Sequence, residues 1–309
     1  MYLEQLRFFH SVAGRGSFTG AARELHLTQP AVSNQIRKLE EDLGQRLFER
    51  QGRQVQLTRA GEILYAHSRK IFQQVREVEG ILKDLKSLHT GSLSLGTVDV
   101  ISIYVLPQLF QQFHRKFPRV EISIQVGDSA SLTRGVLDGV FDLGFITLPV
   151  EERNLVALPI YNDVLRVIAP AGHPLAKQEL VTLGDITRTT LIIYKKGSVT
   201  RKIIEEVFER AGLTLEPDME IDRPEAMKKL VEAGLGVSII PEMTIMKEVA
   251  EGSIVALPTG EVHFERQLGL ICRKGQFFSP STRAFLEILR KELKTRHWIE
   301  LKDDFPMAQ

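Results

Sequence analysis

Residues 18–43 constrain the fold more than any other part of this chain, because they predict two short helices joined by a tight turn. Apolar residues recur at helical spacing in both halves, and the Ala21–Ala22 pair in the first helix lets a neighbouring helix approach closely. Pro30 falls in the first turn of the second helix, where its missing N–H does no harm. A further helical pattern covers residues 3–13. The chain therefore begins with a small all-α domain that contains a helix-turn-helix.

The second of these helices has a polar and basic side opposite its apolar stripe. At about 100° per residue, the stripe lies within a narrow arc formed by Val32, Ile36, Leu39 and Leu43. Short amides, a hydroxyl and a guanidinium face the other way, and such groups match the donors and acceptors of a DNA major groove. From spacing alone, a plain helical bundle with a solvated polar face stays open. The candidate DNA contacts are Gln29, Pro30, Ser33, Asn34, Arg37 and Lys38.

A β-hairpin is predicted directly after the three helices. Two alternating stretches, 47–50 and 55–58, flank Gln51-Gly52-Arg53, which favours a tight turn. Arginines gather in this region. A hairpin beside a helix-turn-helix, with arginines at its tip, is a wing that reaches phosphates or a narrow minor groove. The hairpin adds two further candidate DNA contacts, Arg50 and Arg53.

The first sixty residues resemble the signature of LysR-type transcriptional regulators. The match covers FTGAARELHLTQPAVSNQIRKLE at residues 18–40 and continues through residues 42–50 and 57–61. The resemblance implies a winged helix-turn-helix in a sequence-specific DNA-binding transcription regulator. It implies that residues at the start of the third helix contact bases and backbone, namely Gln29, Pro30, Ser33 and Asn34, and that Arg37 contacts a phosphate. Arg50 and Arg53 would act in the wing.

A long helix is predicted from Thr58, which can cap it, to about residue 88, with only Gly80 against it. From Ile71 onward its apolar residues follow the 4-3-4-3 spacing of a coiled-coil seam. An amphipathic helix packed on its own domain is the alternative. The predicted dimer seam, which Ser68 interrupts, is Leu64, Ile71, Val75, Val78, Leu82 and Leu85. We expect a homodimer, because two recognition helices read two half-sites, and the resemblance implies a homotetramer.

From about residue 91 short apolar strands alternate with helices, which indicates α/β layers. The strands are expected at 93–98, 120–126, 143–147, 164–169, 191–194, 237–240 and 268–272, and the helices near 104–117, 132–139, 201–211, 225–233 and 281–293. The resemblance implies an effector domain of two lobes like those of periplasmic binding proteins. Lobe I would comprise residues 91–162 and 267–296, and lobe II residues 163–266.

The expected organisation is thus an α/β protein with an N-terminal winged helix-turn-helix at residues 1–58, a dimerising linker helix at 59–89 and an effector-binding domain at 90–309. In such a domain a small-molecule effector lies between the lobes, at strand ends and helix N-termini. Residues 196–201 offer amides, two hydroxyls and a guanidinium to an anion, although an ordinary helix cap explains the same residues.

The facing loop, residues 96–102, departs from the family pattern. Many relatives carry hydroxyl residues where Val98 and Val100 stand, and Asp99 adds a negative charge. Asp99 either caps the following helix or faces the cleft, where it would disfavour an inorganic anion or a dicarboxylate. The candidate effector contacts are Asp99, Val100, Ser102, Asp128, Thr147, Ser198, Thr200, Arg201 and Pro224.

Several function classes lack a supporting motif. The sequence contains no P-loop, no dinucleotide-binding glycine pattern, no His-Glu-x-x-His and no nucleophile elbow, so we expect no enzyme and no cofactor. The eight histidines are scattered, so no metal is expected either. The formal net charge is only +1, so a basic footprint for DNA must be local.

No signal pattern and no long apolar run is present, which predicts a cytoplasmic protein without a membrane partner. The single cysteine, Cys272, lies in an apolar run and is expected to be buried. The alternative function is a cytoplasmic small-molecule-binding protein of the solute-binding type with an accessory DNA-binding domain.

Overall fold

A computed structural model of the chain describes residues 2–51, 54–86 and 91–296. These residues form two compact units, Met1–Leu82 and Lys83–Gln309, which are treated separately below. Among the described residues, no helix combines the length and the apolar character that crossing a membrane requires.

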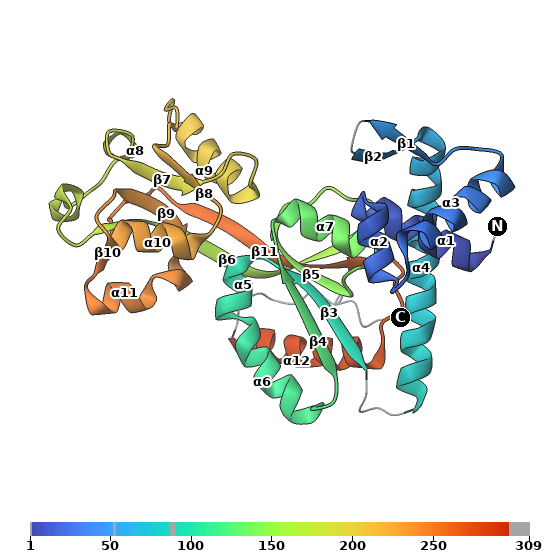
Figure 1. The fold of residues 1–309 in the computed structure, drawn as a ribbon. Helices are drawn as coiled ribbons and strands as arrows, with labels where there is room; N and C mark the ends of the chain where they lie inside the picture. Colours follow the sequence, from blue (N-terminus) through green and yellow to red (C-terminus); the bar gives the residue numbers. More distant parts are fainter. Residues whose placement is uncertain (1, 52–53, 87–90, 297–309) are drawn as a thin grey trace. The chain divides into compact units, whose positions relative to one another are not determined.

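The first unit contains the predicted helix-turn-helix and hairpin (Figure 1). Its elements are α1 (Leu3–Arg15), α2 (Phe18–Glu24), α3 (Gln29–Leu43), β1 (Phe48–Gln51) and β2 (Gln54–Leu57). The two strands pair antiparallel. Gly16 and Gly44 end α1 and α3 in the left-handed conformation that glycine adopts without strain. Between them, Ser17 Oγ accepts the Gly20 N–H and caps α2.

The core of this unit has Phe9, Val32 and Leu39 at its centre, each fully buried. Leu6 and Phe9 on α1 are buried in this core, whereas Leu3, the first residue of the helix, is 52% exposed.

The long helix α4 (Arg59–Lys86) begins as predicted, with Thr58 Oγ1 accepting the Gly61 N–H at 3.1 Å, and it continues through Gly80. Ser68, which interrupts the seam pattern, is fully buried, and its Oγ lies 3.0 Å from His10 Nδ1 on α1. Leu64 and Ile71 also pack against the core of their own unit. The first half of α4 therefore packs on its own unit, and the part that Leu64 and Ile71 would take in a dimer seam stays a prediction.

Further along α4 the seam stays a prediction. Val75 is partly buried and Val78 is 54% exposed. The side chains of Leu82 and Leu85 lie outside the described residues.

The second unit is built on a sheet with the strand order β4-β3-β5-β11-β6-β9-β7-β8, and β10 pairs with β6. The strands are β3 (Ser92–Thr97), β4 (Glu121–Val126), β5 (Leu143–Leu148), β6 (Leu155–Pro170), β7 (Leu191–Tyr194), β8 (Met219–Ile221), β9 (Val237–Pro241), β10 (Ile254–Ala256) and β11 (Phe264–Arg273). The helices are α5 (Asp99–Tyr104), α6 (Leu106–Lys116), α7 (Ser129–Leu137), α8 (Leu183–Ile186), α9 (Val199–Arg210), α10 (Pro224–Glu232), α11 (Met246–Glu251) and α12 (Pro280–Arg296).

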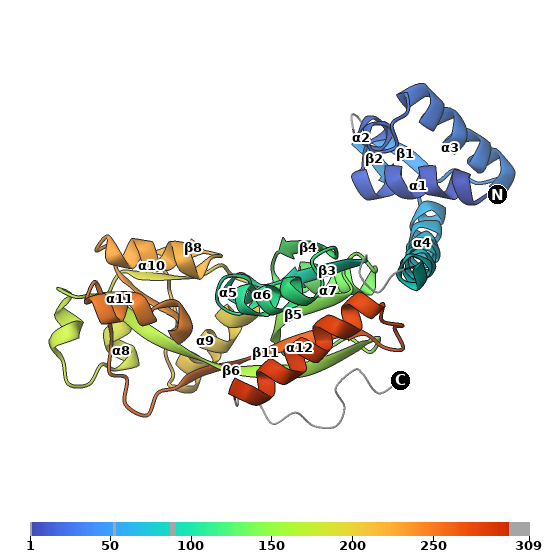
Figure 2. The same ribbon diagram turned by 90° about the horizontal axis from the view of Figure 1, so that it is seen from below.

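Each strand and helix expected from the sequence has a counterpart in this unit. The strands β8 and β10 and the helices α5, α8 and α11 were not predicted, because elements of three to six residues are too short to show a period. β6 and β11 are longer than expected. They run antiparallel from one lobe into the other, and Figure 2 shows them joining the two lobes.

Two separate cores mark the lobes. Ile160 and Leu268 belong to the core of lobe I, whereas Leu165 and Phe264 belong to that of lobe II. The crossing therefore lies near the register pair Asp163 and Arg266 on β6 and β11. Cys272 is 2% exposed in the core of lobe I, as predicted, and burial raises the pKa of its thiol to about 11.

Candidate functional site

The outer face of α3 presents the predicted DNA contacts. Gln29, Pro30, Asn34, Arg37 and Lys38 are exposed, and Ser33 is partly buried. Val32, Ile36 and Leu39 fix the opposite face in the core. Arg37 Nη2 donates to Asn34 Oδ1 at 2.9 Å, which holds the guanidinium along the helix without burying it.

The wing is tied to α3 by a carboxylate. Glu40 Oε1 accepts the N–H of Leu47 at 2.7 Å and that of Phe48 at 3.3 Å, at the entrance to β1. The Phe48 ring packs against Phe9 at a centroid distance of 5.3 Å. The recognition helix and the hairpin thus form one rigid body. The Arg50 side chain and Arg53 lie outside the described residues, and their roles stay predictions.

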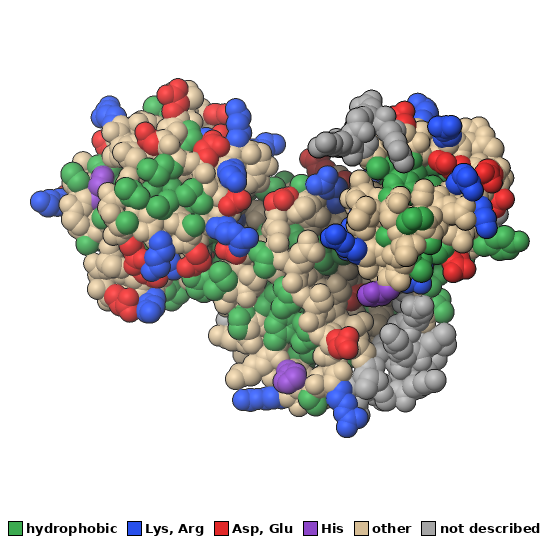
Figure 3. Space-filling model, viewed as in Figure 1, with side chains coloured by type: hydrophobic (Ala, Val, Ile, Leu, Met, Phe, Trp, Pro, Cys, Tyr) green, Lys and Arg blue, Asp and Glu red, His purple; other side chains and the backbone are tan. Residues whose placement is uncertain are grey.

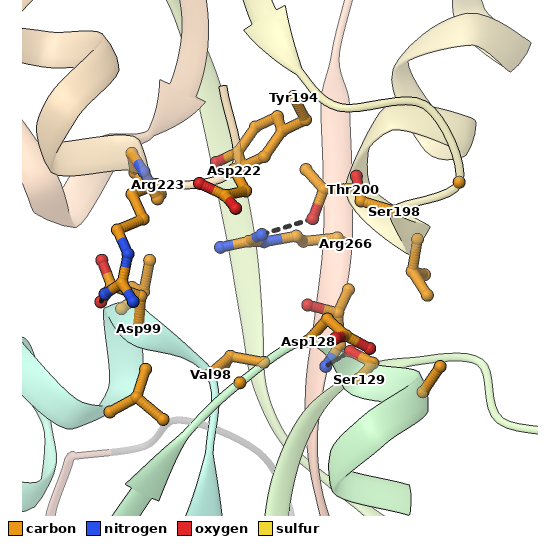
Figure 4. Close-up of a pocket in the computed structure, with 18 residues that line it drawn as sticks. Val98, Asp99, Asp128, Ser129, Tyr194, Ser198, Thr200, Asp222, Arg223 and Arg266 are labelled. Carbon is orange, nitrogen blue, oxygen red and sulfur yellow. Dashed lines mark hydrogen bonds and ion pairs between the residues drawn. The ribbon is translucent and has the colours of Figure 1, made fainter. Parts of the chain in front are cut away.

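A cavity of about 320 Å³ lies between the two lobes of the second unit (Figure 4). On lobe I it is lined by the turns that follow β3 and β4, at residues 98–100 and 126–130, and by Thr147 on β5. On lobe II it is lined by Tyr194, residues 197–200 and residues 222–224, and Arg266 on β11 completes the floor. The carboxyl ends of parallel strands meet at this edge, where such folds bind ligands.

Seven of the nine predicted effector contacts line this cavity: Asp99, Val100, Asp128, Thr147, Ser198, Thr200 and Pro224. Ser102 does not, because it lies one turn into α5 and its Oγ donates to the Asp99 carbonyl at 2.6 Å. Arg201 does not line it either. Its guanidinium is buried away from the cavity. Nε donates to Glu205 Oε1, one turn further along α9, at 2.7 Å, and Nη1 donates to the Tyr194 carbonyl at the end of β7 at 3.2 Å. The expectation that these two side chains face the cleft is wrong.

Arg266 is the main lining residue that the sequence prediction missed. Its Nε donates to Asp163 Oδ2 at 2.8 Å and its Nη1 to Thr200 Oγ1 at 2.6 Å. The side chains of Arg266 and Asp163 are both buried, at 4% and 1% exposed respectively. The signal available in the sequence is a pair of opposite charges within two apolar strands. The family resemblance placed both residues at the lobe boundaries and gave them no role in binding.

Asp99 and Arg223 form an ion pair across the cavity, with Arg223 Nη1 3.1 Å from Asp99 Oδ1. Asp99 is the first residue of α5 and does not cap it, since the cap position is Val98. Asp99 therefore faces the cleft. Burial raises the pKa of its carboxyl, and the Arg223 guanidinium partly opposes that rise.

A second polar cluster joins the lobes beside the cavity. Tyr104 on α5 donates to Glu225 Oε1 on α10 at 2.5 Å. Lys228, buried at 4% exposed, lies 2.9 Å from Glu225 Oε2 and 2.8 Å from Glu248 Oε1. Burial and the Glu225 carboxylate raise the pKa of Tyr104 to about 12, so its hydroxyl stays a donor.

Two known families account for most of the chain. Residues 3–62 match the bacterial regulatory helix-turn-helix proteins of the lysR family, and residues 86–294 match the LysR substrate binding domain. The chain belongs to the LysR family of transcriptional regulators. As the sequence predicted, it is a DNA-binding transcription regulator with an effector-binding domain, and its class is regulatory and not enzymatic.

Relatives match this LysR-type regulator over nearly its whole length. The RuBisCO operon transcriptional regulator of Allochromatium vinosum is 36% identical over 295 residues, which cover 96% of this chain and 97% of the relative. A probable RuBisCO transcriptional regulator of Synechocystis sp. is 32% identical over 299 residues, covering 95% and 87%. Among solved structures, a full-length OxyR variant from Pseudomonas aeruginosa superposes with a TM-score of 0.72 at 25% identity, covering 98% and 99%. Because these relatives are regulators matched over nearly their whole length, they give no support to the alternative of a solute-binding protein.

Proposed function

We propose that this LysR-type regulator binds operator DNA through the outer face of α3 and the wing, and that a small-molecule effector in the interlobe cavity controls it. The observation that carries the proposal is the cavity itself, because its polar lining comes from both lobes. A ligand bound there stabilises one arrangement of the lobes over another and so shifts their populations. Residues Asp99, Val100, Asp128, Thr147, Ser198, Thr200 and Pro224 are the proposed effector contacts. The protein acts on chromosomal DNA in the cytoplasm.

The proposed assembly is a homodimer or a homotetramer. β4 is the end strand of the sheet, and its Ile124 and Val126 are 43% and 37% exposed. Figure 3 shows hydrophobic side chains gathered on this face of lobe I. An apolar strand with an unpaired edge favours association with a second copy. The exposed Val78 on α4 favours the same assembly.

The DNA part of the proposal is tested by electrophoretic mobility shift. We expect the wild-type protein to bind its own upstream region at moderate salt, and a RuBisCO operon promoter is a second DNA suggested by the relatives. Gln29→Ala is expected to weaken specific binding by about 1–3 kcal/mol, because one bidentate base contact is lost. Gln45→Ala, an exposed amide just beyond α3, is the matched control. Wild-type binding no tighter than to scrambled DNA would refute the proposal.

The effector-control part of the proposal predicts that contacts between the lobes set their arrangement in the absence of effector. Asp99→Asn removes the charge that pairs with Arg223, a pair that is partly exposed and is worth about 0.2–1 kcal/mol. We expect faster hydrogen exchange at α5 and at the start of α10 in this variant. Arg188→Gln, which removes an exposed ion pair with Asp185 inside lobe II, is the control. Unchanged hydrogen exchange at both elements would contradict the proposal that the Asp99–Arg223 ion pair holds the two lobes in their resting arrangement.

A further inference from the structure

The floor of the cavity holds two buried hydrogen-bond donors without an acceptor among the described residues: the Tyr194 hydroxyl and Arg266 Nη2. Tyr194 is 4% exposed and Arg266 is 6% exposed, and both line the cavity. Arg266 Nη2 lies 2.7 Å from Asp163 Oδ2 and so takes part in the ion pair, but it has no hydrogen-bond partner among the described residues. Leaving buried donors unpaired costs free energy. A ligand group that accepts from both donors would remove that cost.

The N-terminus of α9 points at the same place. This helix has 12 residues and begins at Val199. Ser198 Oγ accepts the Arg201 N–H at 3.0 Å, while the N–H groups of Val199 and Thr200 lie in the first turn, where a helix offers no acceptor of its own. Arg266 Nη1 donates to Thr200 Oγ1 and so joins this turn to the floor, as Figure 4 shows. Helix amides, a guanidinium and a phenol therefore converge, and together they favour an oxyanion.

The opposite wall has the reverse character. Asp99 and Asp128 bring carboxylates from lobe I, and the Ser131 N–H holds the pKa of Asp128 below its usual range, so that carboxylate stays charged. The Thr147 N–H donates to Ser129 Oγ at 3.1 Å, which leaves the Ser129 O–H to donate elsewhere. This wall offers acceptors and donors to neutral polar groups. Because Arg223 pairs with Asp99, Asp128 is the carboxylate of this wall that repels a second anion.

From this polarity we propose that the effector is a small organic anion with one oxyanionic end, a carboxylate or a phosphate, and a hydroxylated end. The oxyanion binds Tyr194, Arg266 and the first turn of α9, and the hydroxyls face Ser129, Asp128 and Thr147. The cavity volume of about 320 Å³ is at the small end for ligand pockets, which fits a small metabolite. This inference rests on the proposed function, since it assigns the chemistry of the same cavity.

The test compares matched probes by calorimetric titration of the full-length protein. Glycerate and glycerol 3-phosphate carry one oxyanion and hydroxyls, glycerol lacks the anion, propionate lacks the hydroxyls, and succinate is anionic at both ends. We expect one or both hydroxylated anions to bind at least tenfold more tightly than the other three. Their relative affinity decides between carboxylate and phosphate. Equal or tighter binding of succinate, or no binding of either hydroxylated anion, would overturn the inference.

Two variants locate the ends of the ligand. Tyr194→Phe is expected to weaken binding of the preferred anion roughly tenfold or more, because a hydrogen bond to a charged group is lost. Ser129→Ala is expected to weaken the hydroxylated anion and to leave propionate unchanged. Tyr161→Phe, a partly buried tyrosine outside the cavity lining, is the control. Unchanged affinity in Tyr194→Phe, with a thermal midpoint like that of the wild type, refutes the assignment. If the protein binds its operator but none of the probes, only the proposed ligand class is refuted. If it does not bind its operator, the proposed function itself is refuted.

Discussion

Arg266→Met is expected to destabilise the effector domain by about 3–5 kcal/mol, because it leaves a buried carboxylate without its counter-charge. Asp163 is 1% exposed, and its Oδ2 is held by Arg266 alone among the contacts described above. Its Oδ1 has no hydrogen-bond partner within the described part of the chain. Urea unfolding followed by circular dichroism, with hydrogen exchange at β6 and β11 to assign the transition, measures the loss.

The control is the double variant Arg266→Met with Asp163→Asn. It removes both charges, and a neutral pair in a buried site costs much less than one unpaired ion. We therefore expect the double variant to recover at least half of the lost stability. Two results would show that the ion pair does not stabilise the crossing strands. One is a free energy of unfolding of Arg266→Met within about 1 kcal/mol of the wild-type value, and the other is a double variant less stable than the single one.

Phe9→Ala is expected to unfold the DNA-binding domain and to abolish operator binding. Phe9 on α1 is fully buried, and its ring contacts Phe48 on β1 of the wing. Truncating a buried phenylalanine costs about 3–5 kcal/mol, and a domain of this size has about that much stability in total. Mobility shift measures the loss of DNA binding, and hydrogen exchange in α1–α3 measures the loss of structure.

Leu3→Ala serves as the matched control, because Leu3 lies on the same helix and is 52% exposed. We expect this variant to bind DNA like the wild type and the exchange of residues 91–296 to stay unchanged in both variants. Operator binding by Phe9→Ala within about threefold of the wild type, a difference of under 1 kcal/mol, would show that the aromatic core does not hold the recognition helix.

The DNA-binding unit could be predicted in detail because its signals are local. The period of 3.6 residues, a proline in the first turn and hairpin-forming residues each act within a few positions of one another. The face of α3 that carries Gln29 and Asn34 follows from the four apolar residues opposite it. The linker helix was harder. A seam and a packed face have nearly the same period, and only the contact of Ser68 with His10 shows that the first half packs on its own unit.

The cavity could be predicted as a place but not as a set of side chains. Strand ends and helix starts, taken together with the family resemblance, located seven lining residues. The two errors concern side-chain direction. Arg201 was expected in the cavity because it is the third residue of α9, but Glu205, one turn later, draws its guanidinium away. No local pattern decides between these two directions.

What the sequence by itself determined is the class of the protein and the order of its main elements, and it also predicted the surface proposed to meet DNA, because these depend on neighbouring residues and on one long contiguous motif. The tertiary structure alone decided which arginine lies at the floor of the cavity. Arg266 is 66 residues from Thr200 and 103 from Asp163, and only the pairing of β6 with β11 brings the three together. A buried charge takes the direction that satisfies its partners, and those partners are set by the fold.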